Sequence, residues 1–258
     1  MGQFRHPNIV QLLGVVTLAE QAMIVLEFLS RGDLGTFLVN RRPMPGSSVP
    51  QDTPFLLLRF CGDVASGMEY LERKAFVHRD LAARNILVSE DNRCKIGDFG
   101  LCRDLLDEDY YITKGGMIPW RWTAPEVLHY RKYSTASDVW SFGCLMYEIW
   151  SLGHAPFEKL SPQEVQVMLE KGERLAPPPG CPRGVYSLMI DCWHPEHSSR
   201  PSFLSLLKTL ASSPSQLLSW SHEDTWGAGD AIILGASLQT GKQLYPELQL
   251  TYTQRSHQ

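Results

Sequence analysis

Three short motifs in a fixed order constrain this chain more than any other feature of its sequence. Residues 78–85 read HRDLAARN, residues 98–100 read DFG, and residues 124–126 read APE. The groups that carry chemistry in them are the carboxylates of Asp80 and Asp98 and the amide of Asn85. Three ordered motifs are much harder to meet by chance than one short match, and they predict one cleft that holds a base and two metal ligands.

Length, charge and cysteine content restrict the possible domain number, partners and compartment only loosely. The chain has 258 residues and a formal net charge of -4, which allows one large or two small domains and favours neither nucleic acid nor an anionic membrane as a partner. No stretch approaches a membrane span or a signal peptide, so a soluble, cytoplasmic chain is expected. The six cysteines show no C-x-x-C spacing, which disfavours zinc and fits a reducing compartment: Cys61, Cys94, Cys102, Cys144, Cys181 and Cys192.

The first fifty residues predict strands followed by a helix and a loop. Residues 9–16 and 22–28 are short, β-branched and apolar, so they are expected to pair. Asp33 is expected to cap a helix, and residues 41–52 form a loop rich in proline. Thr53-Pro54 predicts a capping hydroxyl followed by proline in the first turn of a longer helix. The apolar stripe of that helix is Leu57, Phe60, Val64, Met68 and Leu71.

The remainder of the chain predicts a helical lobe. Residues 135–138 have the form of a capping box ahead of a helix that is apolar nearly all round to Trp150, and such a helix belongs at the centre of a domain. Ser161 and Glu164 predict a second capping box, and residues 183–193 and 202–210 have helical apolar spacing. Residues 211–258 are expected to be a poorly ordered tail with one short apolar contact at residues 232–234.

The motifs resemble the protein kinase family over roughly residues 1–210 and, within it, receptor-type tyrosine kinases such as the ephrin and insulin receptors. The tyrosine branch is favoured by Ala82-Ala83-Arg84, where serine/threonine kinases usually carry a lysine two residues after the Asp. Residues 119–126 (PWRWTAPE) are similar to a substrate-docking stretch of tyrosine kinases, and Trp122-Thr123 is closest to ephrin-receptor and Src-like forms.

The resemblance implies an α+β, protein kinase-like fold that consists mainly of the helical C-lobe with a partial N-lobe β-sheet. Residues 1–28 would be the partial N-lobe, residues 29–210 the C-lobe, and residues 211–258 the C-terminal tail. It also implies transfer of the γ-phosphate of ATP to tyrosine hydroxyls of protein substrates, with Mg²⁺ as the second cofactor.

Phosphoryl transfer passes through a loose transition state, so a protein mainly positions the reactants and neutralises charge. Asp80 is the candidate that accepts the proton of the substrate hydroxyl. A carboxylate of pKa about 4 is a poor base for a phenol of pKa about 10, so that transfer is expected to come late. Arg84 is expected near the transferred phosphate. Asn85 and Asp98 supply the hard oxygen ligands that suit Mg²⁺.

The resemblance places the adenine pocket at residues 22–29. Leu26 would occupy the selectivity position, Glu27 and Leu29 would offer backbone hydrogen bonds, and Leu87 would close the pocket from below. No glycine-rich loop precedes these residues, and no lysine occurs before Lys74. The sequence is therefore expected to lack the Gly-rich loop, the β3 lysine and the αC glutamate of the family, as an N-terminally truncated kinase would.

Five more residues are expected to act as scaffold. His78 and Phe99 would stack with Leu12 and Met1 in an apolar spine that links the two lobes. Asp138 heads a buried helix, and because an unpaired buried carboxylate is costly we expect it to accept backbone amides from His78 and Arg79. Glu126 and Arg200 resemble the ion pair that ties the docking stretch to the helical lobe.

Tyr110 and Tyr111 lie where kinases of this type carry a loop switched by phosphorylation. A phosphate on them would pair with Arg79 and order the loop, although the pair could also be ordinary surface aromatics. These tyrosines and Tyr245 are candidate docking sites for phosphotyrosine-reading domains, and for Tyr245 an unused tail residue is an equally good interpretation.

Two functional hypotheses remain open from the sequence. In the first, the chain is part of an active receptor-type tyrosine kinase on the cytoplasmic side of the plasma membrane, with any membrane contact made through a part that precedes residue 1. In the second, it is a catalytically weak, pseudokinase-like interaction module, because the Gly-rich loop and its lysine and glutamate are absent. The presence of Asp80, Arg84, Asn85 and Asp98 favours the first.

Overall fold

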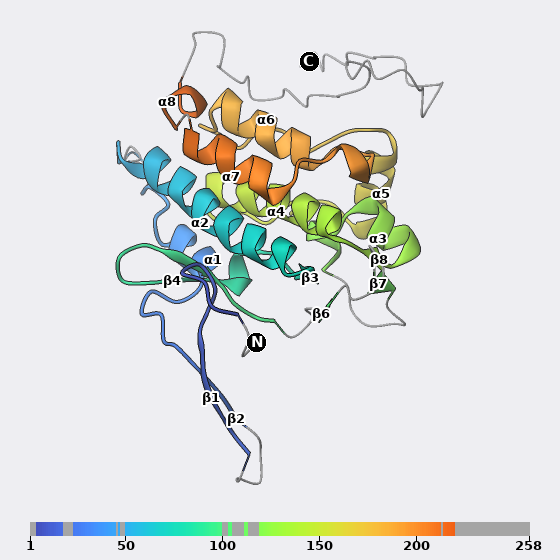
Figure 1. Ribbon diagram of the computed structural model, residues 1–258. Helices are drawn as coiled ribbons and strands as arrows, with labels where there is room; N and C mark the ends of the chain where they lie inside the picture. Colours follow the sequence, from blue (N-terminus) through green and yellow to red (C-terminus); the bar gives the residue numbers. More distant parts are fainter. Residues whose placement is uncertain are drawn as a thin grey trace.

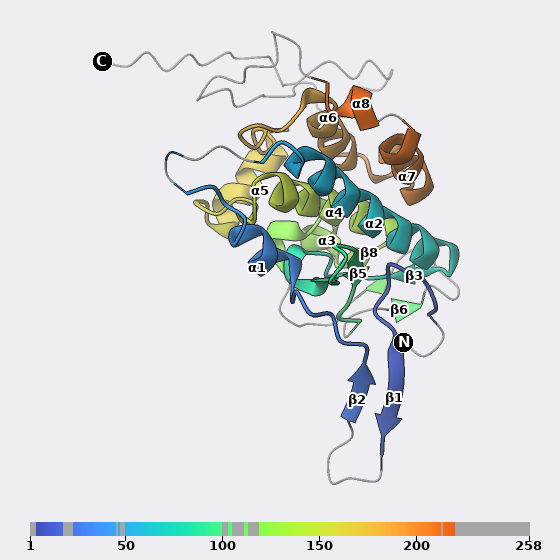
Figure 2. The same ribbon diagram turned by 90° about the vertical axis from the view of Figure 1, so that its left-hand side faces the viewer.

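The structure is a computed structural model that describes residues 4–17, 23–44, 46, 50–99, 103–104, 111–112, 119–212 and 214–219. A body built mainly from helices carries a strand hairpin that projects away from it (Figures 1 and 2). The α+β architecture predicted from the sequence is confirmed. The α-helices are α1 (Leu34–Val39), α2 (Thr53–Arg73), α3 (Pro125–Tyr130), α4 (Thr135–Trp150), α5 (Pro162–Glu170), α6 (Arg183–Cys192), α7 (Phe203–Ser212) and α8 (Pro214–Leu217).

In the described part of the chain the strands are short and pair two by two, and three single turns of 3₁₀ helix lie between the longer elements. The 3₁₀ turns are η1 (Ala83–Asn85), η2 (Trp120–Trp122) and η3 (His197–Ser199). The antiparallel pairs are β1 (Leu12–Val16) with β2 (Met23–Leu26), β3 (Phe76–Val77) with β6 (Arg103–Asp104), β4 (Ile86–Val88) with β5 (Cys94–Ile96), and β7 (Tyr111–Ile112) with β8 (Lys132–Tyr133).

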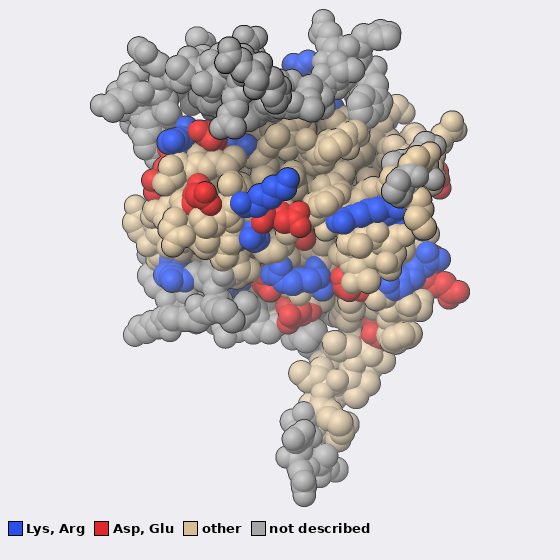
Figure 3. All heavy atoms as spheres, turned by 180° about the vertical axis from the view of Figure 1, so that it is seen from behind, with Lys and Arg blue, Asp and Glu red and all other residues tan. Residues whose placement is uncertain are grey.

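The projecting hairpin is formed by β1 and β2, as the two apolar runs predicted. Val15 lies opposite Ile24, and the register shifts once between Leu12 and Gly14. Its apolar side chains are largely uncovered, because Leu13 is 64% exposed and Ile24 is 63% exposed. Seen from behind, the hairpin extends below the body and carries few charged side chains (Figure 3).

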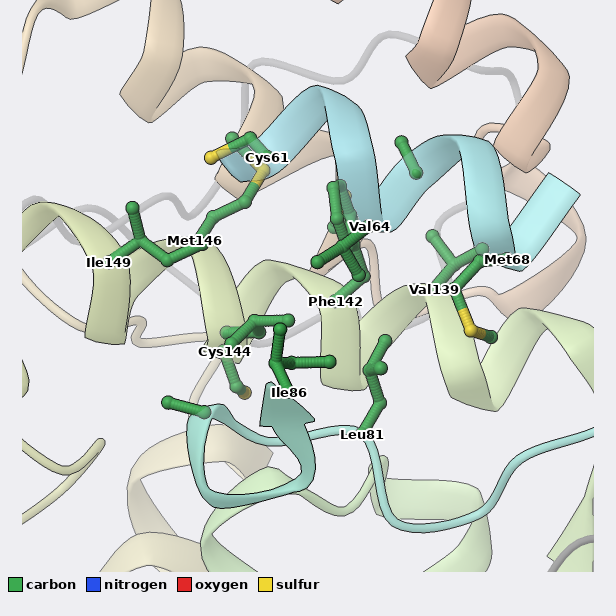
Figure 4. Close-up of a cluster of buried hydrophobic side chains, with 14 of the residues drawn as sticks. Cys61, Val64, Met68, Leu81, Ile86, Val139, Phe142, Cys144, Met146 and Ile149 are labelled. Atoms are coloured by element: carbon green, nitrogen blue, oxygen red, sulfur yellow. The ribbon is translucent and has the colours of Figure 1, made fainter. Parts of the chain in front are cut away.

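Helices α2 and α4 form the centre of the body. The predicted apolar stripe of α2 is buried along its whole length, and α4 is buried on nearly all sides, as expected. Burying each large side chain of this kind contributes about 1.5–3 kcal/mol, so the side chains buried on these two helices contribute substantially to the stability of the body. Figure 4 shows the cluster in which residues of α2, α4 and the intervening segment meet, among them Cys61, Val64, Met68, Leu81, Ile86, Val139, Phe142 and Met146.

Two of the helix caps predicted from the sequence are confirmed, and two others differ from the prediction. The Asp33 carboxylate accepts the N–H of Thr36 at 2.8 Å, and Ser161 and Glu164 form a reciprocal capping box. Thr53 is instead the first residue of α2, and the capping position belongs to Asp52, whose side chain makes no cap hydrogen bond. The α4 box lies one residue earlier than predicted, because the Ser134 hydroxyl is the one that accepts the Ser137 N–H.

The C-terminal helices extend beyond the boundary predicted from the sequence. Helix α7 packs along α2 and continues to Ser212, and α8 follows at residues 214–217. Leu217 of α8 is buried, and its backbone lies against Gly184 of α6, where a Cβ would meet the Leu217 Cα at 3.1 Å. The predicted contact at residues 232–234 lies outside the described residues. Within the described part, no helix combines the length and apolarity needed to cross a bilayer.

Candidate active site

The HRDLAARN segment is held in place by the first turn of α4. The Asp138 carboxylate accepts the backbone N–H of His78 at 2.7 Å and that of Arg79 at 2.9 Å, and these are the two amides that the sequence assigned to it. Asp138 is 1% exposed. Its burial raises the pKa of the carboxyl to about 7, while the two amide bonds act in the opposite direction. The central helix thereby fixes the segment just before Asp80.

Asp80, Arg84 and Asn85 form one hydrogen-bonded cluster. The Arg84 guanidinium donates to Oδ1 of Asp80, and Nδ2 of Asn85 donates to Oδ2 at 2.8 Å and to the Asp80 carbonyl at 2.7 Å. The 3₁₀ turn η1 produces this arrangement, since it folds Arg84 and Asn85 back toward Asp80. Because the amide nitrogen of Asn85 is used by Asp80, its amide oxygen is the atom that can serve a ligand.

Asp98 lies beside this cluster because β4 pairs with β5. The Gly97 N–H donates to the Asn85 carbonyl at 2.8 Å, so Asp98 directly follows a residue that is bonded to Asn85. Asp98 is exposed and has a φ of 48°, and Arg79 has a φ of 74°. Left-handed backbone at a non-glycine residue is uncommon and is concentrated at functional sites. The sequence holds no signal for either conformation.

His78 is a buried, neutral connector. Its Nδ1 accepts the Asp80 N–H at 3.3 Å, so Nε2 carries the proton and donates to the Gly97 carbonyl at 3.0 Å. Burial lowers the pKa of the ring, which agrees with the neutral form. His78 thus links the segment before Asp80 to the segment before Asp98.

The rings of His78 and Phe99 are in edge contact at 5.5 Å between centroids, as expected. A further ring joins them, because Phe4 is buried and lies 5.4 Å from Phe99 and 4.8 Å from Phe76. Leu12 is only partly buried, and its place in the predicted spine, like that of Met1, stays a prediction, since Met1 lies outside the described residues.

The residues expected around adenine lie between the hairpin and the body. The Glu27 N–H donates to the Gln11 carbonyl at 3.0 Å, and the Leu29 carbonyl accepts the Gly32 N–H at 3.3 Å. The groups that remain for a nucleotide are therefore the Glu27 carbonyl and the Leu29 N–H. Leu29 is buried, Leu26 is 37% exposed, and Leu87 of β4 bridges to Asp33 next to this turn.

Sequence reasoning missed one ion pair at this turn. Nζ of Lys95, on β5, contacts both carboxylate oxygens of Glu27 at 2.9 Å and 2.7 Å. Glu27 Oε1 also accepts the N–H of Gln11 at 2.7 Å. The side chain of Glu27 therefore joins the hairpin to the strand that leads into Asp98. Lys95 is brought to this place by tertiary contacts, since β5 pairs with β4 and Ile96 exchanges backbone hydrogen bonds with the segment just before the hairpin, and no local pattern predicts these contacts.

A second missed group is Glu148 in α4. Its Oε2 accepts the Ala83 N–H at 2.9 Å and the Trp122 indole N–H at 2.8 Å, and the Arg84 Cζ lies 4.4 Å from the centre of the Trp122 rings. Glu148 is 7% exposed, and its burial raises the pKa of the carboxyl to about 7. The signal in the sequence was an acidic residue near the end of a largely apolar helix, which also holds Asp138 in its first turn.

Glu126 and Arg200 form the expected ion pair. The two guanidinium nitrogens meet the two carboxylate oxygens at 2.6 Å and 2.8 Å, and the Arg200 side chain is fully buried. Arg200 also donates to the carbonyls of Ala136 and His194. The pair therefore joins α3 to α4 and to the turn before α7.

Arg79, the expected partner of a phosphorylated loop, lies over the ring of Tyr133 with 4.5 Å between Cζ and the ring centre. Tyr133 is paired with Tyr111 across β7 and β8. Arg79 is thereby placed next to the strand that lies opposite Tyr111. Tyr110 and Tyr245 lie outside the described residues.

In the described part of the chain, no three His, Cys, Asp or Glu side chains gather as a metal cluster. The oxygens of Asn85 and Asp98 are the two groups of the predicted set that could hold a divalent ion here. That is the small number of protein ligands that Mg²⁺ takes when phosphate oxygens and water complete its shell. The five described cysteines are buried and free, and burial raises the pKa of each thiol.

The fold and this cluster define a protein kinase catalytic region. A family model described as protein tyrosine and serine/threonine kinase matches residues 1–210, and the chain belongs to this family. Its similar relatives include ephrin type-A receptor 5 of Gallus gallus and ephrin type-A receptor 8 of Rattus norvegicus, each 46% identical over 84% of this chain, and ephrin type-B receptor 4b of Danio rerio, 47% identical over 81%. The chain is thus homologous to the kinase region of ephrin receptor tyrosine kinases. The matched segment spans 21%, 58% and 21% of those three proteins, respectively.

Proposed function

We propose that this chain carries the catalytic region of a protein tyrosine kinase, which transfers the γ-phosphate of ATP to tyrosine hydroxyls of protein substrates. The observation that carries the proposal is the hydrogen-bonded cluster of Asp80, Arg84 and Asn85 with Asp98 beside it. The choice of tyrosine rests on the stretch Ala82-Ala83-Arg84, which has alanine and not lysine two residues after Asp80, and on the similarity to ephrin receptors.

Each residue of the cluster has a role in this proposal. Asp80 orients the substrate hydroxyl and accepts its proton late in the reaction, as the oxygen bonds to phosphorus. Arg84 already contacts Asp80, and its planar guanidinium suits the charge on the transferred phosphate. Asn85 keeps Asp80 in place through two hydrogen bonds from its amide nitrogen.

The donor set fits the two cofactors that the family uses. The oxygens of Asn85 and Asp98 would hold Mg²⁺, which when bound screens the negative charge of the phosphates. The Glu27 carbonyl can accept a hydrogen bond from the amino group of adenine, and the Leu29 N–H can donate to a ring nitrogen. Leu26 and Leu87 offer apolar surface to the faces of the base.

The proposal extends to the organisation of the chain. Residues 1–28 contribute to the N-lobe, the C-lobe begins at residue 29 and includes α7 and α8, and the residues that follow α8 form a tail. In a longer receptor this region would lie on the cytoplasmic side of the plasma membrane. Phosphorylation of Tyr110 or Tyr111 would order the loop through Arg79. Phosphorylated Tyr110, Tyr111 or Tyr245 would bind phosphotyrosine-reading domains.

The test is magnesium-dependent transfer from ATP by the purified full chain to a polymer that contains tyrosine, compared with a polymer that contains serine. We expect labelled tyrosine only, and loss of about 10²- to 10⁴-fold in rate for Asp80→Asn. Asp98→Asn should lower the rate and raise the magnesium concentration that is required. Transfer to serine alone, or an Asp80→Asn variant as fast as the parent, would refute the proposal.

A second candidate function is a catalytically weak interaction module. The observation in its favour is the uncovered hairpin, with Phe28 at its base 88% exposed, because exposed apolar patches mark interaction sites. The same experiment separates the two. A folded chain that binds ATP without transferring phosphate, at any magnesium concentration, would support the interaction module.

A further inference from the structure

Glu148, like Asp138, reaches the catalytic segment from the buried interior of α4, but it has no role yet in the proposed function. A single oxygen, Oε2, accepts two hydrogen bonds there, from the Ala83 N–H at 2.9 Å and from the Trp122 indole N–H at 2.8 Å. Ala83 begins the turn η1 that carries Arg84 and Asn85, and Trp122 ends η2 in the docking stretch. Glu148 thus joins two segments that lie far apart in the sequence.

The Trp122 ring, which is hydrogen-bonded to Glu148, also contacts Arg84. The guanidinium of Arg84 lies over the ring, with 4.4 Å between Cζ and the ring centre, and its Nη2 donates to Asp80. A cation is attracted to the face of an indole ring by the quadrupole of the ring. The exposed Arg84 side chain therefore has a defined position only while the Trp122 ring keeps its orientation.

We propose that Glu148 is a positioning residue for the Asp80, Arg84 and Asn85 cluster, acting through the Ala83 amide and the Trp122 ring. The inference rests on the proposed kinase function and adds a residue that does not touch the reactants. Removal of the carboxyl group leaves the Ala83 N–H and the indole N–H without their acceptor in a buried place. The ring and the turn then move apart, and Arg84 no longer meets Asp80 in one geometry.

The acceptor oxygen, rather than the negative charge, is what the geometry uses. Both hydrogen bonds end on Oε2, so the carbonyl oxygen of a glutamine can receive both. Glu148→Gln is therefore a conservative variant that should rescue the function that Glu148→Ala loses. Trp122→Phe keeps an aromatic ring but removes the indole N–H. Its activity should lie between that of Glu148→Gln and that of Glu148→Ala.

A matched control exists in α2. Glu72 is a half-buried helical glutamate whose burial raises the pKa of its carboxyl, and its Oε2 accepts the N–H of Phe203 at 3.1 Å. That hydrogen bond leads to α7 instead of the catalytic segment. Glu72→Ala should cost stability in the same way as Glu148→Ala without any change in geometry at Asp80.

The experiment has one readout that needs no catalysis. In the ¹⁵N-labelled full chain, the indole N–H signal of Trp122, assigned with Trp122→Phe, reports its hydrogen bond, and the Nε–H signal of Arg84 reports its place over the ring. We expect both signals to shift in Glu148→Ala and to stay close to the parent in Glu148→Gln and Glu72→Ala. Unchanged signals in Glu148→Ala overturn the inference even if the chain transfers no phosphate.

The second readout is kinetic. Since a misplacement of about 1 Å can cost about a hundredfold in rate, we expect the kcat of Glu148→Ala to fall by about 10- to 100-fold while the KM for ATP stays within about twofold. Glu148→Gln should lose no more than about threefold. A Glu148→Ala variant no slower than Glu72→Ala, or a Gln variant as slow as the Ala variant, contradicts the positioning role. A parent chain that lacks activity refutes the proposed function and leaves the spectroscopic test standing.

Discussion

At the scale of single residues, the shape of a side chain matters as much as its charge. Arg84 makes two contacts with one flat group, since it donates to Asp80 and lies over the Trp122 ring. Lysine offers a compact, strongly hydrated charge that cannot do both at once. An exchange of Arg84 for lysine would keep the positive charge but would lose the oriented, planar donor group.

Arg84→Lys should therefore lower kcat for a tyrosine substrate by at least about tenfold, although the net charge is unchanged. Steady-state kinetics with the tyrosine polymer measure this. Arg73→Lys is the matched control, because Arg73 is 65% exposed, pairs with Glu69 one helical turn away and lies outside the site. Equal kcat values for Arg84→Lys and Arg73→Lys would show that the orientation of the guanidinium is unimportant.

At the scale of elements, buried charges connect helices that do not follow one another in the chain. Arg200 connects α3, α4 and the turn before α7 through four hydrogen bonds from its buried guanidinium. Removing one partner of a buried ion pair leaves an uncompensated charge, which costs about 3–5 kcal/mol. Removal of one partner of the Glu126–Arg200 pair should therefore destabilise the helical body.

We expect Glu126→Ala to lower the free energy of unfolding by about 3–5 kcal/mol, since Arg200 keeps its charge in a fully buried position. Urea denaturation followed by circular dichroism measures this. Glu170→Ala, which removes an exposed carboxylate 3.8 Å from His129, should change it by less than about 1 kcal/mol. Similar losses for the two variants would mean that Arg200 is solvated when its partner is absent.

Glu148 should also make stability depend on pH. Its folded-state pKa, raised by burial from 4.5 to about 7, lies above the unfolded value. Its contribution to stability is then fully present below about pH 4.5 and is lost as the pH rises through about 7. Raising the pH from about 5 to about 8 should destabilise the parent relative to Glu148→Gln by up to about 3 kcal/mol.

The measurement is the urea midpoint of both proteins at the two pH values. Glu164→Gln is the control, because Glu164 is exposed and its capping bonds lower the pKa of its carboxyl, so its contribution is constant over this range. A stability difference between the parent and Glu148→Gln that stays the same at both pH values would place the carboxyl pKa near its ordinary value.

At the scale of the whole molecule, local patterns predicted the elements and the motif residues well. The stripe of α2 and the burial of α4 follow from apolar spacing, and the cluster around Asp80 follows from an eight-residue motif. Glu148 and Lys95 could not be found this way, because their partners are brought to them by tertiary contacts. The predicted cap of α4 differs by one residue from the observed one because Ser134 and Thr135 are adjacent and both residue types can cap a helix, although serine is the better cap.

The hairpin exposes apolar side chains that the rest of the described structure leaves uncovered. Among the described residues, β1 and β2 pair only with each other, and their apolar side chains include Leu13 at 64% and Ile24 at 63% exposed. A two-stranded sheet of this kind presents open edges and uncovered apolar surface, both of which promote association between copies. The full chain should therefore self-associate with rising concentration.

Leu13→Thr combined with Ile24→Thr should shift the chain toward monomer, because threonine keeps the preference for strand while removing apolar surface. Sedimentation velocity over a range of concentrations measures the change. Leu204→Thr removes one exposed leucine, 46% exposed, from α7 and should leave association as it is in the parent. If the double variant associated as strongly as the parent, contacts made elsewhere on the body would have to be responsible, and the exposed hairpin would not limit the solubility of this chain.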